Sequence, residues 1–224
     1  MKILHCTDLH FRQPWFEWLA RNASDYSVCC LSGDFLDQEN TSPSQVRAQI
    51  KWIQDWVRWF PGTLVMCSGS GDAVNNRFEN PAWMEELDHE IIFDGGRTVS
   101  GRIWFHSLGW TDWIEAGPTD FEVLVTHVGP ALTKVAWSKD YCGQGEIDLT
   151  YPLKQRGSLV LCGHVHAPLR WWDTCGTSLC LNPGSDFSQS VPNHVIVDFG
   201  RKQATHVVGN RIQDTIKLNL KLHP

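Results

Sequence analysis

Residues 159–166 of the chain read Leu-Val-Leu-Cys-Gly-His-Val-His, and the interpretation of the rest starts from this stretch. The four apolar residues predict a buried strand, and the glycine after them ends it. His164 and His166 follow at a spacing of two, and in extended chain alternate side chains point the same way. The two imidazoles can therefore reach one pocket just past a strand end. A pair of metal ligands and a pair of unrelated surface histidines are both open interpretations.

The composition is that of a globular chain. Its 224 residues are 42% hydrophobic and 20% charged, which is enough for one domain with a full core, so we expect a single domain over residues 1–224. The net charge of −6 disfavours a global attraction to nucleic acid or to an anionic membrane, but a local basic or aromatic groove stays open. We find no secretory signal, no membrane-spanning apolar run and no CxxC pair among the eight cysteines. These features predict a cytoplasmic protein with reduced thiols and no membrane partner.

Hydrophobic periodicity predicts alternating strands and helices, followed by a strand-rich second half. Helices are predicted at 15–22, 42–59 and 81–88, and Ser42 with Pro43 signals the start of the second one. Buried strands are predicted at 1–6, 28–31, 63–67, 121–125, 159–162, 169–172, 178–181, 193–198 and 203–208, with an edge strand in the tail 211–222. This order predicts an α/β fold in which two packed mixed β-sheets are flanked by helices.

Polar side chains gather where the predicted strands end. Open α/β sheets bind ligands at the carboxyl ends of their strands, so these side chains are expected to meet. Five hydrophobic strands end in a cluster of Asp, His or Gly, a coincidence that is difficult to produce without a shared site. The candidate residues are Asp8, His10, Asp34, Asp37, Ser70, Asp72, His127, His164 and His166. Mixed carboxylate and imidazole ligands suit Mn²⁺, Fe, Zn²⁺ or Co²⁺ better than Ca²⁺ or Mg²⁺.

The order and spacing of these clusters resemble the calcineurin-like binuclear metallophosphoesterases. The resemblance covers the whole chain and rests on Asp8-Leu-His10, Gly33-Asp34-Phe-Leu-Asp37, Gly69-Ser-Gly-Asp72, Thr126-His127 and Gly163-His-Val-His166. It implies a double-sheet fold that holds two metal ions about 4 Å apart and hydrolyses phosphate esters with a metal-activated water.

The resemblance also implies a role for each ligand. Asp8, His10 and His166 would hold the first metal ion, and His127 and His164 would hold the second. Asp37 would bridge the two ions. Asp34 would orient a histidine or a bound water from behind the ligands.

One block departs from the family's pattern. The family has Gly-Asn-His followed by Asp or Glu, where this chain has Gly69, Ser70, Gly71 and Asp72. Ser70 would replace an amide ligand of the second metal with a weaker one, and Gly71 cannot contact the phosphate or protonate a leaving group. Three explanations stay open: a variant with a weak second metal, an inactive form, or a substrate that needs little leaving-group protonation. His106 is the candidate replacement acid because it ends a strand before a loop, although a local structural histidine fits the same position.

Substrate choice depends on the loops. The segments around 66–69, 127–130 and 182–185 are similar to those of small bacterial metallophosphoesterases, some of which belong to DNA-repair gene clusters and cut single-stranded DNA with manganese. Lys134, Trp137 and Arg170 are candidate strand contacts through phosphate pairing and base stacking, with core packing and solvation as the alternative.

The expected function is therefore phosphodiester hydrolysis with two divalent ions, manganese first among them, on single-stranded DNA. The alternatives are a phosphomonoesterase or cyclic-nucleotide phosphodiesterase, and a non-catalytic scaffold that binds metal or a protein partner.

Overall fold

The computed structural model describes residues 1–39, 41–74, 81–87, 92–112, 122–140 and 143–219. Within these residues the strands form two mixed sheets of six strands each. Sheet A contains β1 (Lys2–Cys6), β2 (Val28–Ser32), β3 (Leu64–Cys67), β10 (His194–Asp198), β11 (Gln203–Val208) and β12 (Arg211–Lys217). Sheet B contains β4 (Arg97–Ser100), β5 (Ile103–Leu108), β6 (Val123–Thr126), β7 (Leu159–Leu161), β8 (Trp172–Cys175) and β9 (Ser178–Leu181).

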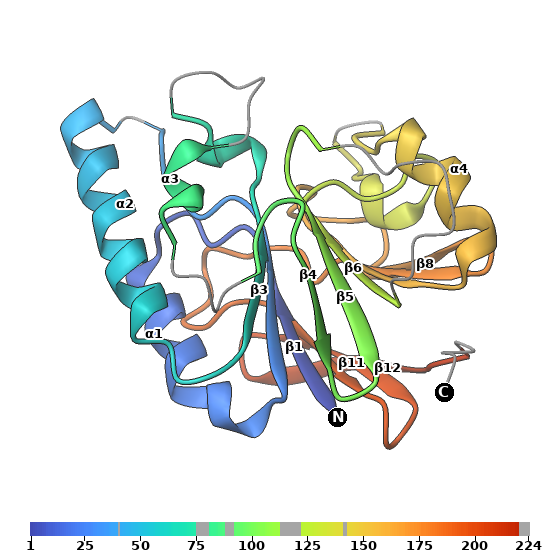
Figure 1. Ribbon diagram of the computed structural model, residues 1–224. Helices are drawn as coiled ribbons and strands as arrows, with labels where there is room; N and C mark the ends of the chain where they lie inside the picture. The colour runs from blue at the N-terminus through green and yellow to red at the C-terminus, as the bar shows by residue number, and fades with distance from the viewer. Residues whose placement is uncertain (40, 75–80, 88–91, 113–121, 141–142, 220–224) are drawn as a thin grey trace.

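The sheets stack face to face, and helices cover both outer faces (Figure 1). On the outer face of sheet A lie α1 (Gln13–Asn22), α2 (Pro43–Arg58) and α3 (Ala82–Glu85), and on that of sheet B lies α4 (Ile147–Arg156). Short 3-10 turns occur at η1 (Ala23–Asp25), η2 (Ser70–Asp72) and η3 (Lys134–Ala136). This arrangement confirms the predicted α/β fold of two packed mixed sheets flanked by helices.

Three apolar layers hold the sandwich together, because strand residues alternate between the two faces of each sheet. In β1, Leu4 and Cys6 pack with Phe16 of α1, whereas Ile3 packs with Phe105 of sheet B. A third cluster, between sheet B and α4, contains Leu124, Val160, Leu149 and Leu153. Each fully buried side chain of this kind stabilises the fold by about 1.5–3 kcal/mol.

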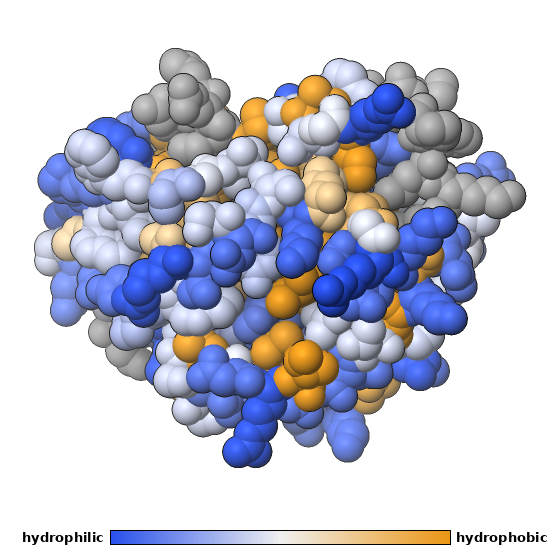
Figure 2. Space-filling view, turned by 90° about the horizontal axis from the view of Figure 1, so that it is seen from below, coloured by the Kyte–Doolittle hydropathy of each residue, from blue (hydrophilic) through white to orange (hydrophobic). Residues whose placement is uncertain are grey.

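The surface of the molecule differs from these apolar layers. The face seen from below is mainly hydrophilic, and its apolar side chains form small patches (Figure 2). No helix among the described residues is long and apolar enough to cross a bilayer. The seven cysteines within the described ranges are buried free thiols, while Cys142 lies outside those ranges.

Parallel strands determine where the site forms. The order β12-β11-β10-β1-β2-β3 places β1, β2 and β3 parallel to one another in sheet A. In sheet B, with the order β4-β5-β6-β7-β9-β8, strands β5, β6, β7 and β9 are parallel. The loops after β1, β2, β6 and β7 meet across the sandwich, and backbone hydrogen bonds join the first two, from Asp8 to Gly33 and from His10 to Asp34.

The element boundaries differ from the prediction at several places, and residues 88, 121 and 220–222 of the predicted elements lie outside the described residues. The strand predicted at 169–172 begins only at Trp172, because the N–H of Leu169 donates to the carbonyl of Trp137 instead of entering a sheet. The predicted tail strand ends at Lys217, at the edge of sheet A. Ser42 caps α2 as predicted, and Gln45 completes the capping box.

Candidate metal centre

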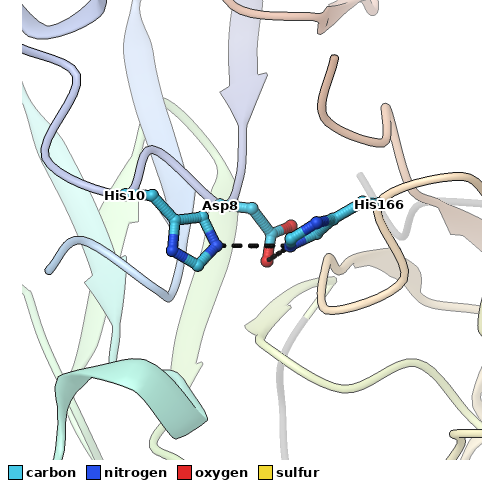
Figure 3. Close-up of side chains that lie close together, drawn as sticks. All are labelled: Asp8, His10 and His166. Carbon is cyan, nitrogen blue, oxygen red and sulfur yellow. Dashed lines mark hydrogen bonds and ion pairs between the residues drawn. The ribbon is translucent and has the colours of Figure 1, made fainter. Parts of the chain in front are cut away.

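Three side chains meet where β1 and β7 end. Asp8 and His10 lie in the loop after β1 and His166 lies in the loop after β7, so the group joins distant segments of the chain (Figure 3). Nε2 of His10 lies 3.2 Å from Nε2 of His166, and the latter atom lies 3.4 Å from Oδ1 of Asp8. One ligand atom of each residue lies within 4.8 Å of the others. The structure thus brings together the three residues predicted for the first metal ion.

The two oxygens of the Asp8 carboxylate have different surroundings, since Oδ1 faces Nε2 of His166 and Oδ2 lies among hydrogen-bond donors. Its Oδ2 accepts hydrogen bonds from Oγ1 of Thr7 at 2.8 Å and from the backbone N–H of His164 at 3.1 Å. Its Oδ1 is buried and accepts no hydrogen bond from the described residues. A Cβ atom at position 163 would collide with Thr7, so the close approach of the two loops requires Gly163.

A second group forms where β2, β6 and β7 end, and it consists of Asp34, His127 and His164. Nε2 of His127 lies 3.4 Å from Oδ1 of Asp34 and 3.2 Å from Nδ1 of His164. The other ring nitrogen of His127 lies 2.8 Å from the carbonyl oxygen of Ser32, a contact that fixes the ring with Nε2 toward the group. Gly33 has a φ of +81°, and a Cβ there would overlap the imidazole of His127.

Asp34 lies between the two groups, in the place that the family resemblance suggested for Asp37. Oδ2 of Asp34 lies 3.9 Å from Nε2 of His10, while Oδ1 faces His127. Asp37 belongs to neither group, because its carboxylate accepts a hydrogen bond from the backbone two residues later. The amide of Gln49 also binds the N–H and the carbonyl of Asp37, which holds this residue beside α2. Asp34, and not Asp37, is therefore positioned to join the two groups.

Asp72 fixes the loop that carries Asp34. Its Oδ1 accepts hydrogen bonds from the N–H groups of Phe35 and Leu36 at 2.7 and 3.1 Å. Its Oδ2 accepts the N–H of Gly69 at 2.9 Å. The buried side chain of Asp72 thus ties the loop after β2 to the loop after β3, a structural task that suits a carboxylate with several acceptor sites.

Asn182 fixes the loop that carries the two histidines of the opening stretch. Its fully buried Nδ2 donates to the carbonyl oxygens of Val135, Gly163 and Val165 at 3.0–3.1 Å. Its Oδ1 accepts the N–H of Gly184 at 2.8 Å. The sequence placed Asn182 in a loop segment similar to those of small metallophosphoesterases, but gave it no role in the site.

Backbone strain concentrates at the same residues. Four of the seven described non-glycine residues with positive φ are Asp8, His10, Asp34 and His164, with values of 51°, 39°, 52° and 67°. Such conformations cost about 1–3 kcal/mol each and persist where the surroundings over-determine them. Their concentration among the candidate ligands is typical of a functional site.

The electrostatics of the site follow from burial and from two carboxylates. Burial lowers the pKa of His127, but Asp34 and Asp8 outweigh this effect and raise that pKa to about 10. Burial raises the pKa of Asp34, but the charge of His127 brings it well below its usual range. Burial and the neighbouring His127 lower the pKa of His164 to about 4. Burial also lowers the pKa of His166, and contact with Asp8 reverses this and raises it.

The donor chemistry of the two groups fits a pair of cations. Each group offers one carboxylate and two imidazoles, a set that suits Mn²⁺, Fe, Zn²⁺ or Co²⁺. In each group two imidazole nitrogens face each other at 3.2 Å, so a cation between them would accept both lone pairs. The buried Oδ1 of Asp8 accepts no hydrogen bond from the described residues and faces only the imidazole of His166, so a cation beside it would satisfy this oxygen.

A cavity of about 330 Å³ opens onto both groups. Its lining includes His10, Asp34 and Ser70, so Ser70 lies beside the candidate ligands. The N–H of Gly71 donates to Oδ1 of Asp34 at 2.6 Å, and a Cβ at position 71 would lie 3.1 Å from the same oxygen. The unusual Ser-Gly pair thus lets the main chain hold Asp34, and a larger residue at position 71 would require Asp34 to move.

The structure does not bring His106 to the site. This residue lies in β5 in register with Leu124, whose side chain packs toward α4. Its neighbour Ser107 donates to the carbonyl of Met66 in sheet A, so alternation turns His106 to the opposite, outer face. Burial and the charge of Arg97 lower the pKa of His106. Its position gives no support to the predicted role as the acid.

The three predicted substrate contacts also lie outside the ligand groups. Lys134 is exposed in η3, and its backbone N–H donates to Asp173. Trp137 is partly buried and follows η3, one residue before the cavity wall at Ser138. Arg170 is exposed, with its guanidinium 4.2 Å from the centre of the Trp172 ring.

Two aromatic side chains that the sequence did not predict at the site lie next to the ligand groups. The ring of Phe187 lies 5.3 Å, centre to centre, from both His10 and His166. The ring of Trp110 lies 5.9 Å from His127 and from His164. Single aromatic residues in loops have no periodicity, so the sequence carried no signal that would have located them.

Comparisons with known proteins agree with this architecture. A sequence model of the family described as calcineurin-like phosphoesterase matches residues 1–168. Among curated proteins, none matches the sequence significantly. The structure resembles that of TT1561 of Thermus thermophilus, with 13% identity and a TM-score of 0.55 over 97% of this chain and 99% of that chain.

Two further solved structures share the fold. One is Yfce, a phosphoesterase from E. coli, with 14% identity and a TM-score of 0.50 over 98% of this chain and 100% of that chain. The other is purple acid phosphatase PPD1 from yellow lupin (Lupinus luteus) seeds, with 11% identity and a TM-score of 0.59 over 96% of this chain and 53% of that chain. By its match over most of its length, the chain belongs to the calcineurin-like phosphoesterase family, a family of metal-dependent hydrolases that act on phosphate esters.

Proposed function

We propose that this chain hydrolyses phosphodiesters with two divalent ions, that manganese is the preferred metal, and that single-stranded DNA is a substrate. The observation that carries the proposal is the pair of three-residue groups that share the neighbourhood of Asp34 at the edge of one cavity. In this proposal Asp8, His10 and His166 hold one ion. The other is held by His127 and His164, Asp34 lies between the ions, and Ser70 is a weak additional ligand.

Residues around the two groups position the candidate ligands, and the buried thiols are not suited to act as nucleophiles. When bound, two divalent ions supply positive charge to phosphate oxygens and lower the pKa of a water toward neutrality. Ser32 orients the ring of His127, and Thr7 orients the carboxylate of Asp8. Burial raises the pKa of every cysteine thiol that the described ranges include, so none of these thiols is prepared to act as a nucleophile.

Access to the site supports a large substrate. The side chains of His166 and His10 are 39% and 26% exposed, so a phosphate within a strand can approach them from solvent. Trp137, which directly precedes Ser138 of the cavity lining, and Lys134 stay candidates for contact with such a strand. Arg170, stacked on Trp172, extends the same candidate surface.

The test is an activity screen of the purified chain with each of Mn²⁺, Zn²⁺, Co²⁺ and Fe²⁺. The substrates are bis-p-nitrophenyl phosphate, p-nitrophenyl phosphate, a cyclic nucleotide and single-stranded oligothymidylate. We expect Mn²⁺-dependent cleavage of the simple diester and the oligonucleotide, and its loss in Asp34→Asn. Asp37→Asn is the matched control, because this carboxylate lies outside both groups and the variant should retain activity.

The other outcomes contradict the proposal in distinct ways. Faster hydrolysis of p-nitrophenyl phosphate than of both diesters would indicate a phosphomonoesterase. Cleavage of the cyclic nucleotide alone would indicate a small-pocket phosphodiesterase. Absence of turnover with all four metals would indicate a non-catalytic scaffold.

A further inference from the structure

A cation and two aromatic rings lie directly beside the candidate metal centre. Arg12 follows the loop that carries Asp8 and His10 and precedes the first residue of α1. Its guanidinium carbon lies 5.1 Å from the centre of the Trp15 ring and 5.7 Å from the centre of the Phe187 ring. Among the described residues, no carboxylate forms an ion pair with Arg12. The side chain is thus held by aromatic contacts while its hydrogen-bond donors stay available.

The two rings connect Arg12 to the ligands. Trp15 and Phe187 are stacked with their centres 5.8 Å apart and their planes 21° apart. The same Phe187 ring contacts His10 and His166 edge to face, and 37% of Phe187 is exposed. A single aromatic ring therefore separates the guanidinium from two of the residues proposed to hold a metal ion.

The surrounding surface forms a second hollow. A cavity of about 630 Å³ is lined by residues 11–15, Gln189 and Ser190, and it is distinct in its lining from the cavity over the ligand groups. Its wall is fixed, because Nε1 of Trp15 donates to the carbonyl of Gln189 and the side chain of Gln189 donates to Asp186. A wall that is already fixed around Arg12 lowers the entropy cost of binding, and the exposed ring of Phe187 lies next to this cavity, against Arg12 and Trp15.

We propose that Arg12 and Phe187 form a subsite for the nucleotide next to the scissile phosphodiester. Arg12 pairs with the neighbouring phosphate, for which the planar guanidinium is the best-matched side chain. The exposed ring of Phe187 offers a stacking surface to the base, a contact that tolerates any sequence. This assignment rests on the proposed phosphodiesterase function and makes Arg12 a specificity residue for strands over isolated diesters. It also explains how a chain of net charge −6 attracts a polyanion locally.

The experiment measures kcat and KM of Arg12→Ala with Mn²⁺ on oligothymidylate of three nucleotides and on bis-p-nitrophenyl phosphate. The latter has neither a second phosphate nor a base. We expect KM for the oligonucleotide to rise about tenfold, the loss of one charge-assisted hydrogen bond, with a smaller change on the simple diester. The slope of log KM against log salt should fall by about 0.7, the value for one single-strand phosphate contact. Arg12→Lys should recover part of the KM, because it keeps the charge without the planar group.

Arg21→Ala is the matched control, since Arg21 lies in the last turn of α1, which Arg12 precedes, and is exposed and paired with Glu17. Equal KM values and salt slopes for the oligonucleotide in Arg12→Ala, Arg21→Ala and the unaltered chain would overturn the subsite. An equal loss on both substrates in a folded Arg12→Ala protein would also overturn it, because Arg12 would then act on the metal centre alone. The unaltered chain could also cleave bis-p-nitrophenyl phosphate but neither bind nor cleave oligothymidylate. This result would contradict single-stranded DNA as the substrate in the proposed function, and the nucleotide subsite with it.

Discussion

Asn182 offers a perturbation whose size can be worked out from the structure. Replacing it with alanine removes one buried amide whose two N–H donors are shared among three carbonyl groups and whose oxygen accepts one N–H. A typical hydrogen bond contributes about 1 kcal/mol net, and a buried group left unpaired costs about 1–3 kcal/mol. Because water can reach some of the freed carbonyls through the new space, we expect Asn182→Ala to lower the free energy of unfolding by about 3–5 kcal/mol.

The same substitution should weaken the metal centre. Gly163 and Val165 flank His164, so the loop that presents this imidazole loses its internal anchor. Loss of a supporting contact of this kind lowers metal affinity about 10–100-fold. Urea denaturation of the metal-free protein gives the stability, and calorimetric titration with Mn²⁺ gives the affinity.

Asn193→Ala provides the matched control. Asn193 is also buried, but its Oδ1 accepts no hydrogen bond from the described residues and it lies next to β10, outside the ligand loops. We expect this variant to lose about 1 kcal/mol or less and to keep its Mn²⁺ affinity. An Asn182→Ala protein that matches Asn193→Ala in both measurements would refute the role given to Asn182.

Three further predictions concern the second ligand group. In the metal-free protein the pKa of His127 is raised to about 10, so the folded state holds this proton more tightly than the unfolded chain, whose imidazole has a pKa of about 6.5. The free energy of unfolding after treatment with EDTA should therefore fall as pH rises from about 6.5 to about 10, and His127→Gln should remove most of that slope in urea titrations. Ser70→Asn should raise Mn²⁺ affinity at the weaker site about tenfold in calorimetric titration, because an amide oxygen is a better ligand than a hydroxyl. Gly71→Ala should lower the Mn²⁺ affinity of the same site, since its Cβ would lie 3.1 Å from the carboxylate of Asp34. Affinities in both variants equal to that of the unaltered chain would contradict the two expectations.

The sequence was most informative where the chain repeats a simple rule. Short apolar runs at 28–31 and 159–162 could only be buried strands, and the period of α2 with its Ser42 cap left little choice. The expectation that side chains at the carboxyl ends of strands meet was sufficient to find all six residues in the two groups, although it did not assign Asp34 its place between them. It needed no knowledge of the loops beyond their first residues.

The sequence was least informative where loop conformation decides. Asp34 and Asp37 are carboxylates three residues apart after the same strand, and no periodicity separates their roles. The positive φ of Asp34 and the clamp of Gln49 on Asp37 separate them in the structure, and both depend on distant segments. His106 fails for a related reason, because strand residues alternate and the choice of face depends on register with β6.

The central claim is that two cations lie on either side of Asp34, one with Asp8, His10 and His166 and one with His127 and His164. It is tested most directly by a crystal structure of the protein with Mn²⁺, with anomalous difference maps recorded at the manganese edge. We predict two peaks about 3.5–4 Å apart, with Asp34 in contact with both and Asp37 with neither. A single peak, or two peaks joined by Asp37 while Asp34 contacts neither, would contradict the claim.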